Sequence, residues 1–190
     1  MRIIAMVIPH VKAIIPARFS DHRGFFSEIY NKGCLTEYGI DLDFVQDNHS
    51  FSTQKGTVRG LHFQTPPFAQ DKLISVLKGS VLDVAVDMRK GSPDFGKHVA
   101  VVLSAEEGKQ LLVPIGFAHG FCTLEPDTQV FYKVTNYYSP EHDKGVYWAD
   151  SDIGIDWPVS EAAAYLSEKD GRLPRLAELP NYFVYEGSGA

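Results

Sequence analysis

The chain has 190 residues, enough for one well-packed domain, predicted over residues 1–185, and too few for two domains of ordinary size. Its composition, 44% hydrophobic and 22% charged, is that of a globular protein, and no apolar run approaches the roughly 20 residues of a membrane-spanning helix. A net charge of -6 argues against a nucleic-acid surface, so we expect neither a membrane nor a nucleic acid as a partner.

The first residues faintly suggest a secretory signal, but Pro9 and His10 cut the apolar run Ile3–Ile8 short and no small-residue cleavage site follows. We therefore expect a cytoplasmic protein. The two cysteines, Cys34 and Cys122, lie far apart and lack the spacing of a disulfide framework or a thiolate zinc site. Both are expected to be buried thiols or thiols without a function.

Glycine and proline recur at short intervals, which is typical of many short strands. Enrichment in β-branched and aromatic residues predicts strands over Leu73–Leu77, Ser80–Met88, His98–Leu103, Gln110–Val113 and Thr128–Tyr138. Helical signals are confined to Cys34–Tyr38 and to the C-terminal segment Ser160–Leu179, where Ala, Glu, Leu and Lys collect.

Polar and apolar residues alternate in Ser80–Met88, which indicates a half-polar strand, and Lys78-Gly79 before it is typical of a hairpin turn. In Thr128–Tyr138 the same period of two puts Tyr132 and Tyr138 on one face. Turns every ten residues or so favour an all-β double-sheet jelly-roll barrel with short peripheral helices and an open end for a ligand.

The stretch Gly56–Lys72 is the most informative, because it gathers Arg59, His62 and Lys72 around a Gly- and Pro-rich turn. Such cations could hold a ketone or a phosphate. Fifty residues later a Pro-x-Gly turn precedes a second histidine, His119. Together the two segments indicate one small barrel with histidines at its mouth.

The segment Pro114–His119 resembles the second signature of the cupin barrels, in which a Pro-x-Gly turn precedes an inward-facing histidine. Metal-binding cupins also carry His-x-His and a later glutamate in the first signature, but here Gln64 takes the place of the second imidazole after His62. Two histidines are a poor metal cage, since such sites usually need about three protein ligands. We predict a barrel without metal or other cofactor, whose histidines are free for proton chemistry.

A single histidine is more often packed or solvated than catalytic, and it is the convergence of Arg59, Gln64 and Lys72 near His62 that favours a base. On a regular strand Arg59 and His62 would face opposite sides. Gly60 could mark a bulge that re-aims Arg59, so the direction of Arg59 stays open.

Other candidates also have simpler explanations. Tyr132 and Tyr138 could be core aromatics, and Ser167 followed by Asp170 is a capping-box pattern that starts a helix. In the functional alternatives, a tyrosine donates a proton to a carbanion, and Asp170 accepts an imidazole N–H and fixes its tautomer. Lys169 would then meet phosphate.

Eight strings spread from about Arg18 to Asp170 closely resemble the dTDP-4-dehydrorhamnose 3,5-epimerase family. They are DHRGFFSE at 21–28, VQDNHS at 45–50, RGLH at 59–62, PP at 66–67 with the later Lys72, PIGFAHGF at 114–121, YK at 132–133, NYY at 136–138 and LSEKD at 166–170. The resemblance implies an isomerase that epimerises C3 and C5 of dTDP-4-dehydro-6-deoxy-D-glucose in dTDP-L-rhamnose biosynthesis.

In this family a histidine removes protons alpha to the 4-keto group. His62 matches that base and Asp170 its dyad partner. Imidazole is too weak a base for such a C–H unless a cation stabilises the enolate, and Lys72 matches that role. Inversion needs a proton from the opposite face of the ring, and Tyr132 matches the family's acid.

The resemblance also implies a set of substrate contacts. Arg23, Glu28, Gln46, Asn48, Arg59, His119 and Lys169 match contacts to sugar, diphosphate or thymidine, and Tyr138 matches a ring stacked on thymine. Side-chain cations must hold the diphosphate, because the chain has neither a P-loop nor a GxGxxG turn.

Two positions depart from the family pattern: Phe63 stands where tyrosine is frequent, and Asp143 matches a polar contact only loosely. Because relatives with nearly the same residues invert only C3, a 3-epimerase stays an alternative. A metal-dependent cupin dioxygenase would need a third ligand beside His62 and His119. A non-catalytic sugar-nucleotide-binding protein could dispense with the acid Tyr132 and with the dyad partner.

Members of this family are homodimers, so we expect a homodimer whose partner molecule is a dTDP-sugar. The segment Ile3–Ile8 could pair across the interface and cover an exposed strand edge. Residues 186–190 are expected to form a flexible tail.

Overall fold

The computed structural model describes residues 1–187, so residues 188–190 of the predicted tail lie outside the described part. Its strands are β1 (Arg2–Ala5), β2 (Lys12–Ile15), β3 (Arg18–Asp21), β4 (Gly24–Ser27), β5 (Gln46–Ser52), β6 (Val58–Gln64), β7 (Lys72–Lys78), β8 (Ser80–Asp87), β9 (Arg89–Lys90), β10 (His98–Ser104), β11 (Gln110–Val113), β12 (Phe117–Thr123), β13 (Thr128–Val134), β14 (Asp143–Gly145) and β15 (Phe183–Val184). Within residues 1–187 there are also one α-helix, α1 (Lys32–Glu37), and two 3₁₀ turns, η1 (Asp170–Arg172) and η2 (Leu176–Glu178).

Strand β8 shows how the alternating pattern builds the fold. Val81 belongs to one buried cluster and Val84 to another, because successive side chains of a strand point to opposite sides. The period of two is confirmed. The polar residues Asp83 and Asp87 are nevertheless fully buried, so the half-polar pattern marks charges inside the barrel rather than a solvated face.

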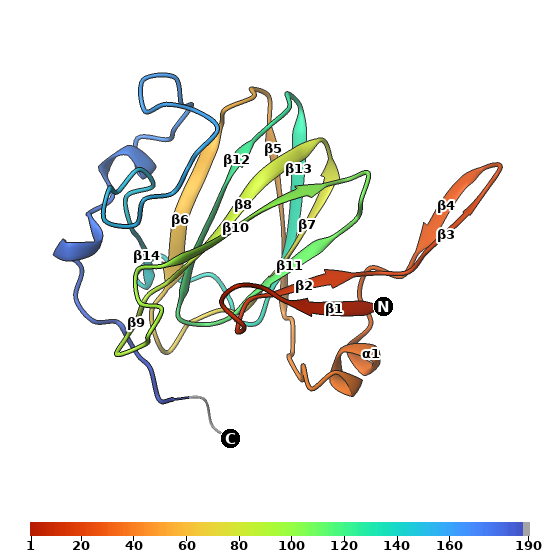
Figure 1. Ribbon diagram of the computed structural model, residues 1–190, viewed down its shortest axis with the longest axis horizontal. Helices are drawn as coiled ribbons and strands as arrows, with labels where there is room; N and C mark the ends of the chain where they lie inside the picture. Colours follow the sequence, from red (N-terminus) through yellow and green to blue (C-terminus); the bar gives the residue numbers. More distant parts are fainter. Residues whose placement is uncertain (188–190) are drawn as a thin grey trace.

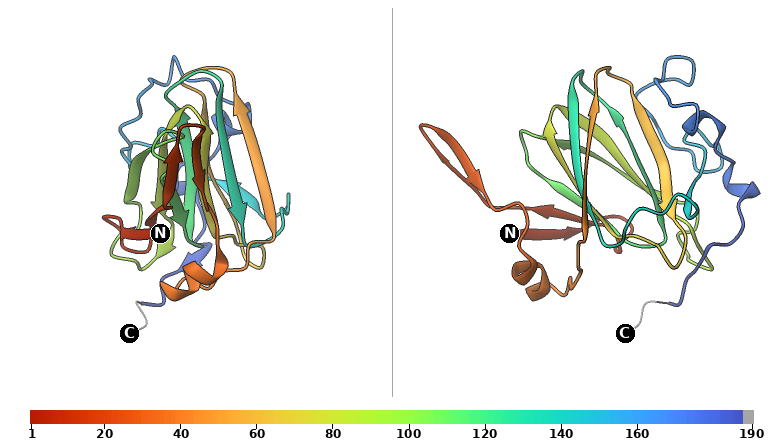
Figure 2. Two further views of the ribbon diagram at one scale, coloured as in Figure 1. Left: turned by 90° about the vertical axis from the view of Figure 1, so that its right-hand side faces the viewer. Right: turned by 180° about the vertical axis from the view of Figure 1, so that it is seen from behind.

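Two antiparallel sheets enclose the interior (Figures 1 and 2). The strand order is β1-β2-β11-β7-β13-β5 in the six-stranded sheet and β10-β8-β12-β6-β14 in the five-stranded sheet. Ile74 and Leu111 from the first sheet pack against Val81, Val99 and Phe121 from the second. The predicted jelly-roll barrel is confirmed.

Lys78-Gly79 does not form the predicted hairpin, since β7 and β8 lie in different sheets. The dipeptide instead turns the chain from one wall of the barrel to the other. Gly79 has a φ of +76°, and a Cβ there would lie 2.5 Å from Oγ1 of Thr128. The turn chemistry is recognisable from sequence, but the strand that each neighbour pairs with is not.

The C-terminal segment is not the helix predicted over Ser160–Leu179. It crosses the outside of the five-stranded sheet in an extended path with only the short turns η1 and η2. Tyr165 forms a parallel bridge with Thr57, and its backbone bonds Gly56 and Val58. This tertiary pairing overrides a local helix propensity.

Three smaller predictions have mixed outcomes. The helix predicted near Cys34–Tyr38 is present as α1, with the side chain of Asn31 as its N-cap. The strand predicted to reach Tyr138 ends at Val134, so Tyr132 and Tyr138 do not share a strand face. Within residues 1–187, no helix is long and apolar enough to span a membrane.

Strands β3 and β4 form a hairpin that projects away from the barrel, and we call residues 18–27 the arm (Figures 1 and 2). Three aromatic side chains on it, Phe19, Phe25 and Phe26, are exposed. Next to the base of the arm, β1 pairs with β2 and forms one edge of the six-stranded sheet.

Candidate active site

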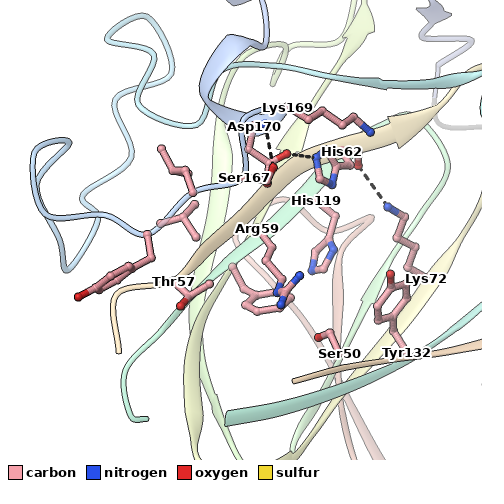
Figure 3. Close-up of a pocket in the computed structure, with 14 residues that line it drawn as sticks. Ser50, Thr57, Arg59, His62, Lys72, His119, Tyr132, Ser167, Lys169 and Asp170 are labelled. Atoms are coloured by element: carbon pink, nitrogen blue, oxygen red, sulfur yellow. Dashed lines mark hydrogen bonds and ion pairs between the residues drawn. The ribbon is translucent and has the colours of Figure 1, made fainter. Parts of the chain in front are cut away.

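A cavity of about 490 Å³ opens inside the barrel (Figure 3). Its walls come from both sheets and from the C-terminal segment. The lining residues are Ser50, Thr57, Val58, Arg59, His62, Lys72, His119, Phe121, Tyr132, Tyr165, Leu166, Ser167, Lys169 and Asp170.

A β-bulge at Gly60 decides where Arg59 points. His119 pairs with His62 and Phe121 with Arg59, so β6 has one residue more than β12 across this interval. Gly60 has a φ of +118°, and a Cβ on it would lie 2.7 Å from the Cα of Gly120. The extra residue turns both Arg59 and His62 to the cavity, which answers the question that the sequence left open.

His62 forms a short hydrogen bond with Asp170. Its Nε2 lies 2.6 Å from Oδ1 of Asp170, and the backbone N–H of Gly60 reaches the other carboxylate oxygen at 3.4 Å. Burial alone would raise the pKa of Asp170, but the hydrogen bonds from His62, Gly60 and Ser167 lower it below its usual value. The ionised carboxylate can therefore hold an N–H of the imidazole.

The capping explanation for Ser167 and Asp170 is correct for the backbone only. The hydroxyl of Ser167 accepts the N–H of Asp170 at 3.1 Å, at the start of η1. The carboxylate of Asp170 is engaged by His62 and is not part of a capping box.

Lys72 enters the cavity from the first residue of β7. Its side chain is buried, and its ammonium donates to the carbonyl oxygen of His62 at 3.2 Å (Figure 3). Burial lowers the pKa of Lys72 to about 8, an effect that nearby Asp143 and Asp83 oppose. A cation therefore sits beside the His62 segment in a water-poor environment.

Tyr132 points into the cavity from β13, in the sheet opposite to that of His62. Burial raises the pKa of its phenol above the usual value, an effect that Arg59 opposes and Asp143 strengthens. The phenol thus keeps its proton near neutral pH. The candidate base and the candidate acid come from the two facing walls of the barrel (Figure 3).

Arg59 and His119 also line the cavity. Arg59 donates from Nε to Oγ of Ser52 at 3.1 Å and from one terminal nitrogen to the carbonyl of Phe51 at 2.9 Å. The Nε2 of His119 lies 3.0 Å from Oδ1 of Asp83. Each cavity histidine is thus bound to a buried carboxylate.

A smaller cavity of about 240 Å³ adjoins the first and shares four of its lining residues, His62, Lys72, Tyr132 and Lys169. Gln46, Asn48, Gln64, Tyr138 and Asp143 also line it, together with Phe63 and Gln70. Most candidate substrate contacts therefore converge on these two connected cavities.

Asp143 lies closer to the site than its loose sequence match indicated. One of its carboxylate oxygens lies 2.5 Å from the ammonium of Lys169 and accepts the hydroxyl of Tyr138 at 3.1 Å. The side chain of Gln64 has a structural role. Its amide nitrogen donates to the carbonyls of Phe68 and Tyr137 and so fixes the loop that precedes β14.

Two predicted substrate contacts lie outside these cavities. Arg23 stands at the tip of the arm, highly exposed and paired with Asp21 at 2.6 Å. Glu28 follows the arm and accepts a hydrogen bond from Asn31. Within one chain the structure does not bring Arg23 or Glu28 to the cavity.

Several lining residues were missed by the sequence analysis. Ser50 lies in the string VQDNHS but was not singled out, Thr57 belongs to none of the strings, and Tyr165 lay within the wrong helix prediction. Asp83 does not line the cavity but was also missed, although a carboxylate between Val81 and Ala85 on the inner face of a strand indicates a buried partner. Among residues 1–187, no group of three or more His, Cys, Asp or Glu side chains is arranged to hold a metal ion.

Comparisons with known proteins agree on one family. A family model described as dTDP-4-dehydrorhamnose 3,5-epimerase matches residues 5–178. A relative of the same name from Sinorhizobium fredii is 52% identical over 181 residues, which cover 95% of this chain and 92% of the relative.

Two solved structures are similar over nearly the whole chain. The dTDP-4-dehydrorhamnose 3,5-epimerase from Bacillus anthracis, with TDP and PPi bound, is 51% identical with a TM-score of 0.89, covering 92% of this chain and 98% of that one. The dTDP-6-deoxy-D-glucose-3,5-epimerase from Legionella pneumophila, in complex with dTDP-4-keto-L-rhamnose, is 43% identical with a TM-score of 0.93, covering 98% and 99%. The chain belongs to the dTDP-4-dehydrorhamnose 3,5-epimerase family.

Proposed function

We propose that this enzyme converts dTDP-4-dehydro-6-deoxy-D-glucose to dTDP-4-dehydro-L-rhamnose by epimerisation at C3 and C5, as a step of dTDP-L-rhamnose biosynthesis. The observation that carries the proposal is the cavity in which the His62–Asp170 pair faces Lys72 and Tyr132 from the opposite wall. Family membership supports the reaction, and this geometry supports the roles proposed below.

His62 is the proposed base, and its Nδ1 is the atom that takes the proton. Asp170 holds Nε2–H at 2.6 Å, so the lone pair of the neutral ring lies on Nδ1. When Nδ1 gains the proton of a carbon next to the ketone, the ring becomes an imidazolium and Asp170 offsets its positive charge. No free hydroxide or cofactor is needed for this step.

Lys72 is the proposed enolate stabiliser. As the C–H bond breaks, its electron pair moves into the ring and negative charge collects on the ketone oxygen. A buried ammonium stabilises that charge far more than water would, because the cavity has a low effective dielectric. Lys72 remains protonated up to a pH of about 8, which suits this role near neutral pH.

Tyr132 is the proposed acid. Its phenol returns a proton to the carbon from the face opposite to His62, which inverts the centre, and the phenolate then regains a proton while His62 loses one. Their origin in facing sheets supports this division of work. The same pair can act at C3 and at C5, since both carbons flank the one ketone.

The remaining candidates are proposed to hold the nucleotide. Arg59 and Lys169 are cations on the walls of the two connected cavities and suit a diphosphate. Tyr138 presents an exposed ring for thymine, next to Gln46 and Asn48. His119 is proposed as a sugar contact.

We further propose that the chain, a single domain over residues 1–185, acts as a homodimer. Arg23 and Glu28 lie on or beside the arm, outside the chain's own cavity, and the arm exposes three aromatic rings. Insertion of the arm beside a second copy would bury these rings and offer Arg23 and Glu28 to the partner's substrate. The pairing of Ile3–Ile8 across the interface stays a prediction, since β1 also pairs with β2 within the chain.

A cytoplasmic location is proposed as well. Fractionation of cells that produce the natural protein would test it, and recovery of the protein outside the cytoplasm would contradict it.

Solvent exchange tests the proposed reaction. The 4-keto sugar nucleotide is incubated with the protein in D₂O, and C3 and C5 are followed by NMR. We expect deuterium at both carbons and the L-sugar as product. Deuterium at C3 alone would indicate a 3-epimerase, and none at either carbon would refute the epimerase. Stoichiometric iron in the purified protein would revive a metal-dependent cupin.

A further inference from the structure

A second histidine–carboxylate pair lies beside the first in the barrel. The Nε2 of His119 is 3.0 Å from Oδ1 and 3.1 Å from Oδ2 of Asp83. His119 and His62 are directly opposed residues on the paired strands β12 and β6, so their rings are neighbours on one wall. His119 lines the cavity, whereas Asp83 lies behind it on β8.

The carboxylate of Asp83 is energetically unfavourable in a barrel interior, because burial removes it from water. Its side chain is fully buried on the inner face of β8, between the apolar residues Val81 and Ala85. Among the described residues, His119 supplies the hydrogen bonds that its carboxylate receives. An apolar residue would fill the same space without the desolvation penalty that a buried carboxylate carries. Packing alone therefore does not explain a carboxylate at this position, and its contact with His119 indicates its role.

The hydrogen bonds between Asp83 and His119 indicate what this role is. An ionised carboxylate only accepts hydrogen bonds, so Nε2 of His119 must carry the hydrogen. With both oxygens of Asp83 close to this atom, the ring is held in one direction and Nδ1 is left for the cavity. The negative charge is also felt by Lys72, where it opposes the lowering of the pKa by burial.

We propose that Asp83 is a positioning residue that fixes His119 as the Nε2–H tautomer and presents Nδ1 to the sugar nucleotide. The two imidazoles of the cavity are thus oriented by separate carboxylates, Asp170 on the C-terminal segment and Asp83 on β8. The effect on turnover rests on the proposed function, but the tautomer of His119 does not.

The tautomer is measured first, by NMR of wild-type protein with ¹⁵N in the histidine rings. His119 is assigned by the signals that vanish in His119→Gln. We expect its Nε2 to resonate as a protonated nitrogen and its Nδ1 as an unprotonated one at neutral pH. An unprotonated Nε2 on His119 would overturn the proposal, and this result needs no variant of Asp83 to fold.

A double-mutant cycle then tests whether Asp83 acts through His119. We expect Asp83→Asn, which keeps the shape but removes the charge, to lower kcat/KM by about 10–100-fold. The double variant with His119→Gln should be no worse than His119→Gln alone, within about threefold. Losses that multiply would show an independent structural role and contradict the proposal.

Asp87→Asn is the matched control. Asp87 is equally buried on the same face of the same strand, but its carboxylate binds Arg89 and Ser92 outside the cavity. We expect its kcat/KM to stay within about threefold of wild type even where the protein loses stability. A loss as large as that of Asp83→Asn would overturn the proposal. Absence of wild-type turnover would refute the proposed function, and the NMR result would then decide the tautomer alone.

Discussion

Burial and neighbouring groups shift the pKa values of three side chains of the candidate site, Asp170, Lys72 and Tyr132. Asp170 stays ionised because its hydrogen bonds outweigh burial, and it in turn orients His62. Burial acts in opposite senses on the two groups of the facing wall, lowering the pKa of Lys72 and raising that of Tyr132. An ionised Asp170, a protonated Lys72 and a neutral Tyr132 can thus coexist near neutral pH.

The proposed role of Lys72 predicts how activity depends on pH. Since its pKa is about 8, the ammonium loses its proton as the pH rises through this value, and stabilisation of the enolate is lost. We expect kcat/KM of the wild type to fall about tenfold for each pH unit well above 8. A profile that stays flat from neutral pH to beyond pH 9 would contradict the role of Lys72.

The dyad partner is tested by Asp170→Asn. The amide can donate an N–H to Nε2 of His62, which moves the ring hydrogen to Nδ1 and removes the lone pair that takes the substrate proton. We expect kcat to fall by about 10²–10⁴-fold. The control is Glu168→Gln, two residues away and exposed, which should be near wild type. Equal losses in both variants would mean that the segment merely unfolds.

At the scale of elements, the bulge in β6 aligns Arg59 with His62, and Gly60→Ala tests it. Gly60 combines a positive φ with a Cβ position 2.7 Å from the backbone of Gly120. We expect a loss of about 3 kcal/mol or more in the free energy of unfolding, measured with urea. Gly24→Ala, also at positive φ but with open space around it, should cost only about 1 kcal/mol. Similar values for both would argue against a tight bulge.

The strands were predictable because period-two patterns and β-branched residues act locally, as in β8 and β11. What failed depends on distant partners. Lys78-Gly79 predicts a hairpin, but its two flanking strands belong to different sheets. The C-terminal segment has helix propensity, but Tyr165 pairs with the backbone beside β6 instead. The candidate residues of the barrel came from motifs, whereas the direction of Arg59 needed the observed register.

At the scale of the whole molecule, the proposed insertion of the arm into a second copy would make the site a property of two chains, and mixing two variants that each lack one part of the site tests this. Arg23→Ala has an intact barrel, and His62→Ala has an intact arm. In a mixed dimer the barrel of the first meets the arm of the second, so one complete site is restored. After exchange of subunits we expect about a quarter of wild-type activity, because about half of the dimers are mixed and each has one complete site. No recovery, despite mixed dimers detected by mass, would contradict arm exchange.

The central claim is that base and acid act from facing sheets, and Tyr132→Phe in D₂O tests it most directly. The rates of deuterium uptake at C3 and C5 and of inversion are measured by NMR in the same sample. Because His62 and Lys72 are intact in this variant, we expect uptake to continue while inversion falls by at least about tenfold, whereas His62→Ala should lose both. Equal loss of uptake and inversion in Tyr132→Phe would contradict the account.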